Sequence, residues 1–246
     1  MNNEILVISG CTGVGKTALS LELAKRLNIE IISADSMQIY KSLNIGTSKP
    51  DKEELKLCEH HMIDIVSPNE NFNVFEFVTE AKRIIPEIIS RNNLPVIVGG
   101  TGLYIESLIK DYDFGKADPK SSNAYNFKHI FIYKDRAETY KAIDKRVDLM
   151  IEQGLVDEVK TLHEMGVGED CQSMQAIGYK EICAYLNNQI SLKDAIELIK
   201  KNSRNYAKRQ LTWFRHMDCE WVSVDKGVSE LVESLCKTYS RYKKAL

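Results

Sequence analysis

The sequence lacks any sign of a zinc site or a disulfide framework. Its six cysteines are scattered, with no C-x-x-C pair and no histidine at ligand spacing. The adjacent His60 and His61 point in different directions in regular structure and have no third ligand nearby, so they predict no metal site either. We therefore expect free thiols, as in the reducing cytoplasm.

The sequence also lacks a membrane segment. No apolar run is long enough to cross a bilayer, and neither a basic leader nor a cleavable apolar segment precedes the first predicted strand. We expect a soluble, cytoplasmic monomer with no membrane contact.

The net charge is close to zero, at −2, which argues against a protein that coats nucleic acid without sequence preference. The charge is uneven, however, because no Asp or Glu occurs between Glu197 and Asp218. That stretch contains basic and aromatic residues: Lys200, Lys201, Arg204, Lys208, Arg209, Arg215, Tyr206, Trp213 and Phe214. The run is typical of a solvated helix face, although cations alternating with aromatics also suit RNA binding.

Short apolar runs alternate with longer helical patterns, which predicts an α/β fold with a parallel sheet covered by helices. The expected strands are residues 4–9, 30–33, 95–98, 129–133 and 220–224. The expected helices are residues 18–27, 74–91, 137–153, 155–165, 175–186 and 192–214, with a kink or break at Pro86. We expect residues 1–110 to form the first part of the core, 111–127 a polar loop, and 128–246 the rest of the core with a small helical appendage.

A phosphate-binding pattern follows the first predicted strand. Residues 10–17 read GCTGVGKT and fit the spacing G-x-x-x-x-G-K-[ST]. The glycines would let backbone N–H groups surround an anion, Lys16 would add charge, and the Thr17 hydroxyl would hold Mg²⁺. The candidate residues are Gly10, Thr12, Gly13, Gly15, Lys16 and Thr17. A plain glycine turn is the alternative, but the preceding strand and following helix favour phosphate.

Two further segments follow predicted strands and should reach the same sheet edge. Asp35 could accept a proton or join a Mg²⁺ shell, and Gln38 offers the paired donor and acceptor that an adenine edge requires. Alternatively, Asp35 caps a helix that starts at Ser36. The second segment, Gly99-Gly100-Thr101-Gly102, offers the Thr101 hydroxyl to a phosphate or a reacting group, or is a purely structural turn.

Together, seven segments resemble the tRNA dimethylallyltransferase family. They are residues 10–17, 35–40, 45–50, 60–64, 98–104, 175–181 and 204–215. The resemblance implies a P-loop NTPase-like fold and a Mg²⁺ requirement. It also implies transfer of a dimethylallyl group from dimethylallyl diphosphate to N6 of the adenosine 3′-adjacent to the anticodon of tRNA, with release of diphosphate.

The resemblance gives roles to individual residues. Gly13, Gly15, Lys16 and Thr17, joined by Arg215, would stabilise the departing diphosphate, and Thr101 would lie beside it. Asp35 would be the base. The target adenosine, flipped from its stack, would meet Asp35, Ser36, Met37 and Gln38, and RNA phosphates would meet Lys208 and Arg209.

The chain departs from longer family members in one place, because the loop 111–127 replaces a helical insertion that helps to grip the anticodon stem. This difference leaves a prenyltransferase acting on free adenine nucleotides as an alternative. A P-loop small-molecule kinase is a more distant one.

Overall fold

A computed structural model of the protein describes residues 3–111 and 125–244. Its centre is a six-stranded sheet in the order β3-β2-β4-β1-β5-β6, with every neighbouring pair parallel. The strands are β1 (Glu4–Gly10), β2 (Ile29–Ala34), β3 (His60–His61), β4 (Leu94–Gly99), β5 (Asn126–Tyr133) and β6 (Glu220–Ser223). The predicted α/β parallel sheet is confirmed. Strand β3 was not predicted, because a strand of two residues is too short to show the alternation of apolar and polar side chains.

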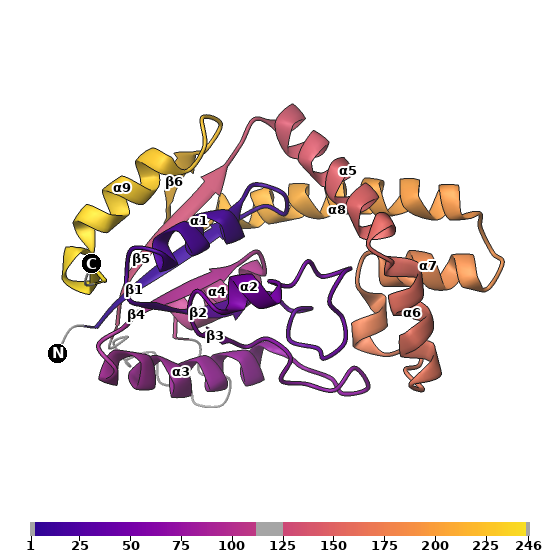
Figure 1. Ribbon diagram of the computed structural model, residues 1–246, viewed down its shortest axis with the longest axis horizontal. Helices are drawn as coiled ribbons and strands as arrows, with labels where there is room; N and C mark the ends of the chain where they lie inside the picture. The colour runs from indigo at the N-terminus through magenta and orange to yellow at the C-terminus, as the bar shows by residue number, and fades with distance from the viewer. Residues whose placement is uncertain (1–2, 112–124, 245–246) are drawn as a thin grey trace.

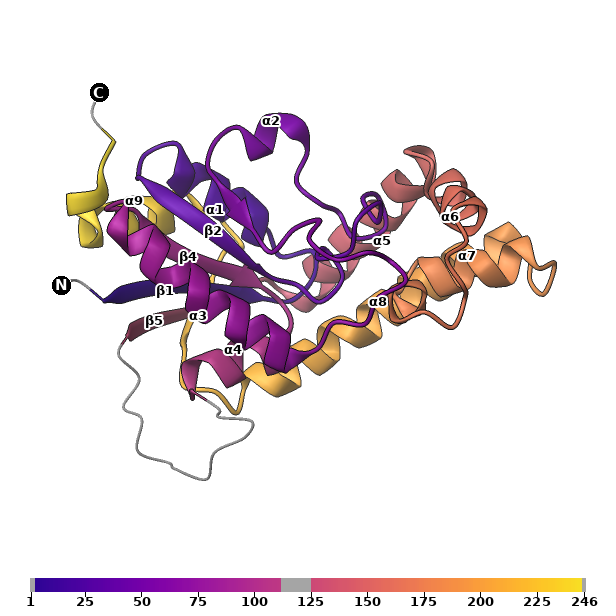
Figure 2. The same cartoon turned by 90° about the horizontal axis from the view of Figure 1, so that it is seen from below.

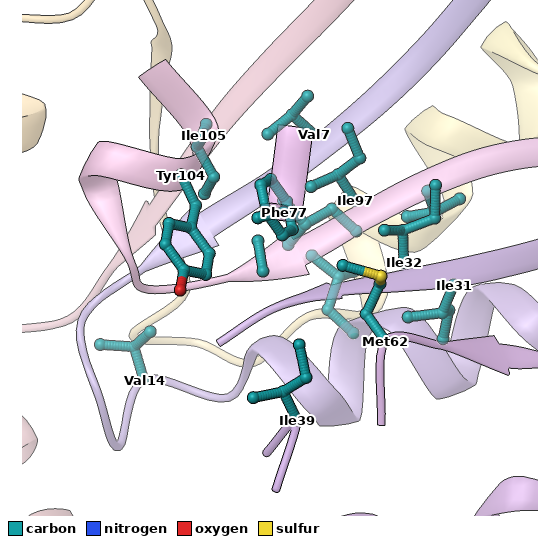
Figure 3. Close-up of a cluster of buried hydrophobic side chains, with 14 of the residues drawn as sticks. Val7, Val14, Ile31, Ile32, Ile39, Met62, Phe77, Ile97, Tyr104 and Ile105 are labelled. Atoms are coloured by element: carbon teal, nitrogen blue, oxygen red, sulfur yellow. The ribbon is translucent and has the colours of Figure 1, made fainter. Parts of the chain in front are cut away.

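Helices cover both faces of the sheet, which explains why the central strands are almost continuously apolar. In Figure 1, α1 (Lys16–Ala24) and α3 (Val74–Ser90) lie on opposite sides of it. Between α3 and the sheet, the ring of Phe77 stacks on that of Tyr104 at 4.5 Å, close to Val7 and Ile97 (Figure 3). Tyr104 belongs to α4 (Gly102–Ile109), so this core fixes the start of α4 against the sheet.

Helix α3 continues past Pro86 to Ser90, so no break occurs at the proline. Its buried stripe, which includes Ile84, Ile85 and Ile88, spans that position and holds the last turn against the core. Packing therefore outweighs the one backbone hydrogen bond that the proline removes.

The second half of the chain forms a helical appendage beside the sheet. Its helices are α5 (Arg136–Glu152), α6 (Leu155–Glu164), α7 (Tyr179–Leu186) and α8 (Leu192–Phe214). Figures 1 and 2 show α8 running from the sheet outward to α7, away from both termini. The short α2 (Lys52–Leu55), the final α9 (Ser229–Thr238) and the 3-10 turns Gln172–Gln175 and Ser240–Tyr242 complete the described elements.

Glu158 of α6 ties this appendage to the core. Its carboxylate accepts hydrogen bonds from the backbone N–H groups of residues 44–46 and, at 2.6 Å, from the hydroxyl of Tyr179. The loop after β2 is thereby held against α6 and α7, on the side where the strands end.

Most of the predicted loop 111–127 lies outside the described residues, and its last two positions, Asn126 and Phe127, belong to β5. The remaining division of the chain stays a prediction. Among the described helices, none combines the length and the apolar character that crossing a membrane requires.

Candidate active site

A cavity of about 570 Å³ lies at the carboxyl edge of the sheet, a size typical of small-molecule sites. Three predicted segments line it: the phosphate loop with Thr12, Gly13, Gly15, Lys16 and Thr17, the turn Asp35-Ser36-Met37-Gln38, and Gly100 of the second glycine turn. Helices α5 and α8, residues 46–48, residues 175–177 and Lys180 of α7 add the remaining walls. The three segments therefore meet at one sheet edge, as expected, because parallel strands all end on the same side of the sheet.

The phosphate loop needs its glycines because Gly13 and Gly15 adopt φ values of 84° and 103°, in the left-handed region. The Lys16 ammonium donates hydrogen bonds of 3.0 Å to the carbonyls of Gly10 and Cys11, which keeps it inside the loop. Burial lowers the pKa of Lys16 to about 8, although Asp35 opposes that shift. Gly10 itself does not line the cavity but supplies one of these carbonyls.

Arg146 of α5 is a wall residue that the sequence interpretation missed. It lines the cavity with Lys16 and Asp35, and its Nε is buried without a hydrogen-bond partner among the described residues. Burial lowers the pKa of Arg146 while Asp35 raises it, yet a guanidinium stays charged at neutral pH. Lys16 and Arg146 thus meet Asp35 here, Lys180 and Arg209 also line the cavity, and the surplus positive charge suits a polyanion.

Asp35 follows directly after β2 and organises the turn that comes next. Its Oδ1 accepts hydrogen bonds from the backbone N–H groups of Met37 at 2.9 Å and Gln38 at 3.3 Å. Residues 36–39 form a turn and no helix, so the capping alternative holds only in part. The hydrogen bonds of the described residues use only Oδ1, which leaves Oδ2 for a ligand.

Thr101 is joined to this turn from the opposite side. Its Oγ1 accepts a hydrogen bond of 3.1 Å from the backbone N–H of Ser36, and its own N–H donates to the carbonyl of Ala34. Thr101 precedes α4 without capping it through its side chain, so its hydroxyl stays beside the Asp35 turn.

The Gln38 amide is occupied by protein groups. Its oxygen accepts from Ser33 Oγ at 3.0 Å, and its nitrogen donates to the carbonyls of Thr47 and Ser48. Gln38 lines the cavity, but these bonds assign its amide to holding the loop after β2 rather than to reading a base edge.

Arg215, which was expected to join the phosphate loop, does not line this cavity, so its role at the diphosphate stays a prediction. Arg215 is exposed just after the end of α8 and is not a cavity residue. The cavity side of α8 carries Ser203, Tyr206 and Gln210, at spacings of three and four residues. Arg215 lies five residues after Gln210, off that face.

The cationic side chains of α8 have different surroundings at the two ends of the helix. Near its start, Lys200 pairs with Asp148 at 2.7 Å and Arg204 pairs with Asp144, so these charges serve helix packing. Near its end, Arg209 lines the cavity, while Lys208 faces an adjoining groove.

A phosphate loop at the edge of a parallel sheet, facing a cationic cavity with one free carboxylate oxygen, defines an α/β protein of the P-loop class that binds a phosphorylated ligand. Comparison with known proteins narrows this class. The profile of the IPP transferase family matches residues 38–124 and 115–217, and the chain belongs to that family.

Curated relatives support the same family. A tRNA dimethylallyltransferase of Anoxybacillus flavithermus is 42% identical over 90% of each chain, and one from Lactococcus lactis subsp. cremoris is 42% identical over 91% of this chain and 93% of its own. The first alignment extends over 282 positions, more than the 246 residues here, so that relative contains residues that this chain lacks.

Solved structures share the fold. A tRNA isopentenylpyrophosphate transferase of Bacillus halodurans superposes with a TM-score of 0.88 at 36% identity, covering 98% of both chains. A eukaryotic dimethylallyltransferase described as acting on tRNA gives 0.81 at 25% identity, over 99% of this chain and 81% of that one.

Proposed function

We propose that this protein modifies tRNA by moving a dimethylallyl group from dimethylallyl diphosphate to N6 of the adenosine 3′-adjacent to the anticodon. Relatives of this name that match nine-tenths of the chain support the reaction. The observation that carries it is the cavity itself, in which Lys16 and Arg146 face Asp35. Cations suit the departing diphosphate and the carboxylate suits the reacting amine.

The first part of the reaction breaks the allylic C–O bond, and its electron pair goes to the diphosphate oxygen. Lys16, Arg146 and the backbone N–H groups of the phosphate loop stabilise that charge as it develops. Arg146 thus takes the role that the sequence interpretation gave to Arg215.

The second part forms the bond from N6 to the allylic carbon. The amine proton becomes acidic only as this bond forms, so a carboxylate of ordinary basicity suffices. Asp35 accepts the proton on Oδ2, because Oδ1 is held by the turn. Thr101 keeps that turn in place through Ser36.

Magnesium fits the residues present. The Thr17 hydroxyl lines the cavity beside the phosphate loop, and with diphosphate oxygens it would offer the oxygen ligands that Mg²⁺ prefers. When bound, the ion would neutralise diphosphate charge and so ease its departure.

The remaining proposals concern the state of the protein. We propose a monomer, because the described residues of one chain already bring the phosphate loop, Asp35 and Arg146 to a single cavity. All six cysteines are free, which supports a reducing cytoplasm, where tRNA substrates also occur.

The test compares acceptors with labelled dimethylallyl diphosphate as donor. Unmodified tRNA should accept label far faster than AMP, ADP or ATP, and the reverse preference would overturn the acceptor. Asp35→Asn should abolish transfer while tRNA still binds. Phosphoryl transfer from ATP without any prenyl product would instead indicate the kinase.

A further inference from the structure

A second hollow adjoins the cavity on the outer side of α8. This groove of about 550 Å³ is lined by Glu106, Lys208, Arg209, Thr212, Trp213 and His216. Figure 2 shows its two elements, α4 and the end of α8, side by side. Arg209 lines both hollows, so the groove lies next to the cavity in which the adenosine would react.

The groove presents an aromatic ring to solvent. Trp213 is 41% exposed, so a considerable part of a large aromatic surface lies in solvent. Its ring is fixed from behind by Gly102, where a Cβ atom would come within 2.4 Å of Trp213 Cδ1. A rigid ring with an open side is a stacking platform for a nucleobase.

The charges around this ring favour a polyanion. Lys208 and Arg209 form none of the ion pairs found in the described part of the chain, unlike Lys200 and Arg204 of the same helix. The carboxylate in the groove, Glu106, is paired with Lys110 at 2.5 Å. Arg209 also lies over the Tyr206 ring at 5.5 Å, and two cations without an ion pair among the described residues, beside an exposed indole, suit a phosphate and the base attached to it.

We infer that this groove binds an unpaired nucleotide of the tRNA anticodon loop next to the target adenosine. Its base stacks on Trp213, and Lys208 and Arg209 contact the phosphates that lead into the cavity. A base flipped from its stack leaves its neighbour without a stacking partner, and Trp213 replaces that partner. The inference rests on the proposed tRNA substrate and adds a second contact to it.

Fluorescence tests the stacking directly, because the chain has only two tryptophans. In a Trp221→Phe variant, an unmodified anticodon stem-loop RNA should quench Trp213. An abasic site on one side of the target adenosine should remove the quenching, whereas an abasic site elsewhere in the loop should not. Equal quenching by every abasic RNA, or none by the intact RNA, would overturn the inference.

Binding constants give an independent test. Trp213→Ala should weaken stem-loop binding about 5- to 100-fold, with donor affinity unchanged and Trp213→Phe restoring most of the loss. Unchanged RNA affinity, with altered self-association or protein binding, would assign the groove to a protein partner and overturn the inference.

The salt dependence of RNA binding shows whether a lysine contacts an RNA phosphate or only adds to the overall positive charge of the protein. Lys208→Ala should reduce the slope of log K against log salt by about 0.7, as expected for one lost contact to a single strand. Lys201→Ala removes an exposed lysine of the same helix outside the groove and should leave the slope unchanged. Equal slopes in both variants would contradict the inference.

These results are distinguishable from failure of the proposed function. If the wild-type protein prenylates tRNA but Trp213 and Lys208 have no effect, only the groove assignment fails. If the wild-type protein prenylates free nucleotides and not tRNA, the acceptor itself is wrong.

Discussion

The side-chain amide of Gln210 connects Thr12 of the phosphate loop to Gly100 of the second glycine turn. Its oxygen accepts from the Thr12 N–H at 2.9 Å, and its nitrogen donates to the Gly100 carbonyl at 3.0 Å. A Cβ atom on Gly100 would lie 2.2 Å from that nitrogen, so only glycine allows the approach. One buried residue of α8 thus sets the spacing of two loops that face the same cavity.

Replacing Gln210 by Ala should therefore loosen both loops. It would leave two inward-facing backbone groups without partners, at an expected cost of about 1 to 3 kcal/mol in the free energy of unfolding. Diphosphate affinity should fall as well, because the phosphate loop loses its support. Urea unfolding and calorimetric titration with diphosphate measure both effects. Gln189→Ala, an exposed glutamine before α8, should change neither, and equal losses in the two variants would contradict this role.

The second prediction separates Arg146 from Arg215. Arg146→Ala should reduce kcat/KM for prenyl transfer about 100- to 1000-fold, because it removes a charged donor facing the leaving group. Arg215→Ala should stay within about twofold of wild type, since that side chain is exposed outside the cavity. Steady-state kinetics at saturating tRNA would decide, and the opposite ranking would return the role to Arg215.

The third prediction concerns the pH dependence of diphosphate binding. The pKa of Lys16 is lowered to about 8 by burial. The anion binds the protonated ammonium, so affinity should be level below pH 8 and fall up to about tenfold per pH unit above it. Titration calorimetry across pH 6.5–9.5 measures this bend. Lys16→Gln should bind more weakly and lose the bend, and a bend that persists would assign it to another group.

The fourth prediction concerns stability in acid. His129 is buried on β5, where its Nε2 lies 2.7 Å from Ser9 Oγ, and burial lowers its pKa to about 4 despite the opposing charge of Asp218. Between pH 6.5 and 4 the unfolded chain binds a proton that the folded chain does not, so stability falls as the pH falls. The shift corresponds to about 3 kcal/mol. Comparing urea unfolding of wild type with His129→Gln isolates this contribution, because the variant should lack it.

Several elements could be predicted because their cause is local. The range 192–214 predicted for α8 matches the structure, since its apolar residues recur at helical spacing from the Ser191 cap onward. The phosphate loop was readable for a similar reason, because consecutive residues supply its N–H groups, charge and hydroxyl. Asp35 lies at the expected sheet edge and lines the cavity because parallel strands end on the same side of a sheet, whereas Thr101 meets this turn through Ser36 and does not line the cavity.

Arg146 and Gln210 could not be predicted, although both lie in the sequence stretches that were read as helices. Which residue of a helix faces a cavity depends on how the helix rotates and crosses the sheet, and neither quantity is written in the local pattern. For the same reason, the sequence could not show that Arg215 does not line the cavity. The amide of Gln38 was assigned to a base because nothing local shows that Thr47 and Ser48 occupy it.

The sequence by itself determined the parallel α/β fold and the phosphate loop, because both follow from short-range spacing and strand direction. The tertiary structure decided which cations of distant helices face the cavity. It assigned Lys200 and Arg204 to helix packing, whereas Lys208 and Arg209 form no ion pair with any residue that the structure describes. Charge acts through space, so its role depends on neighbours that only the fold brings together.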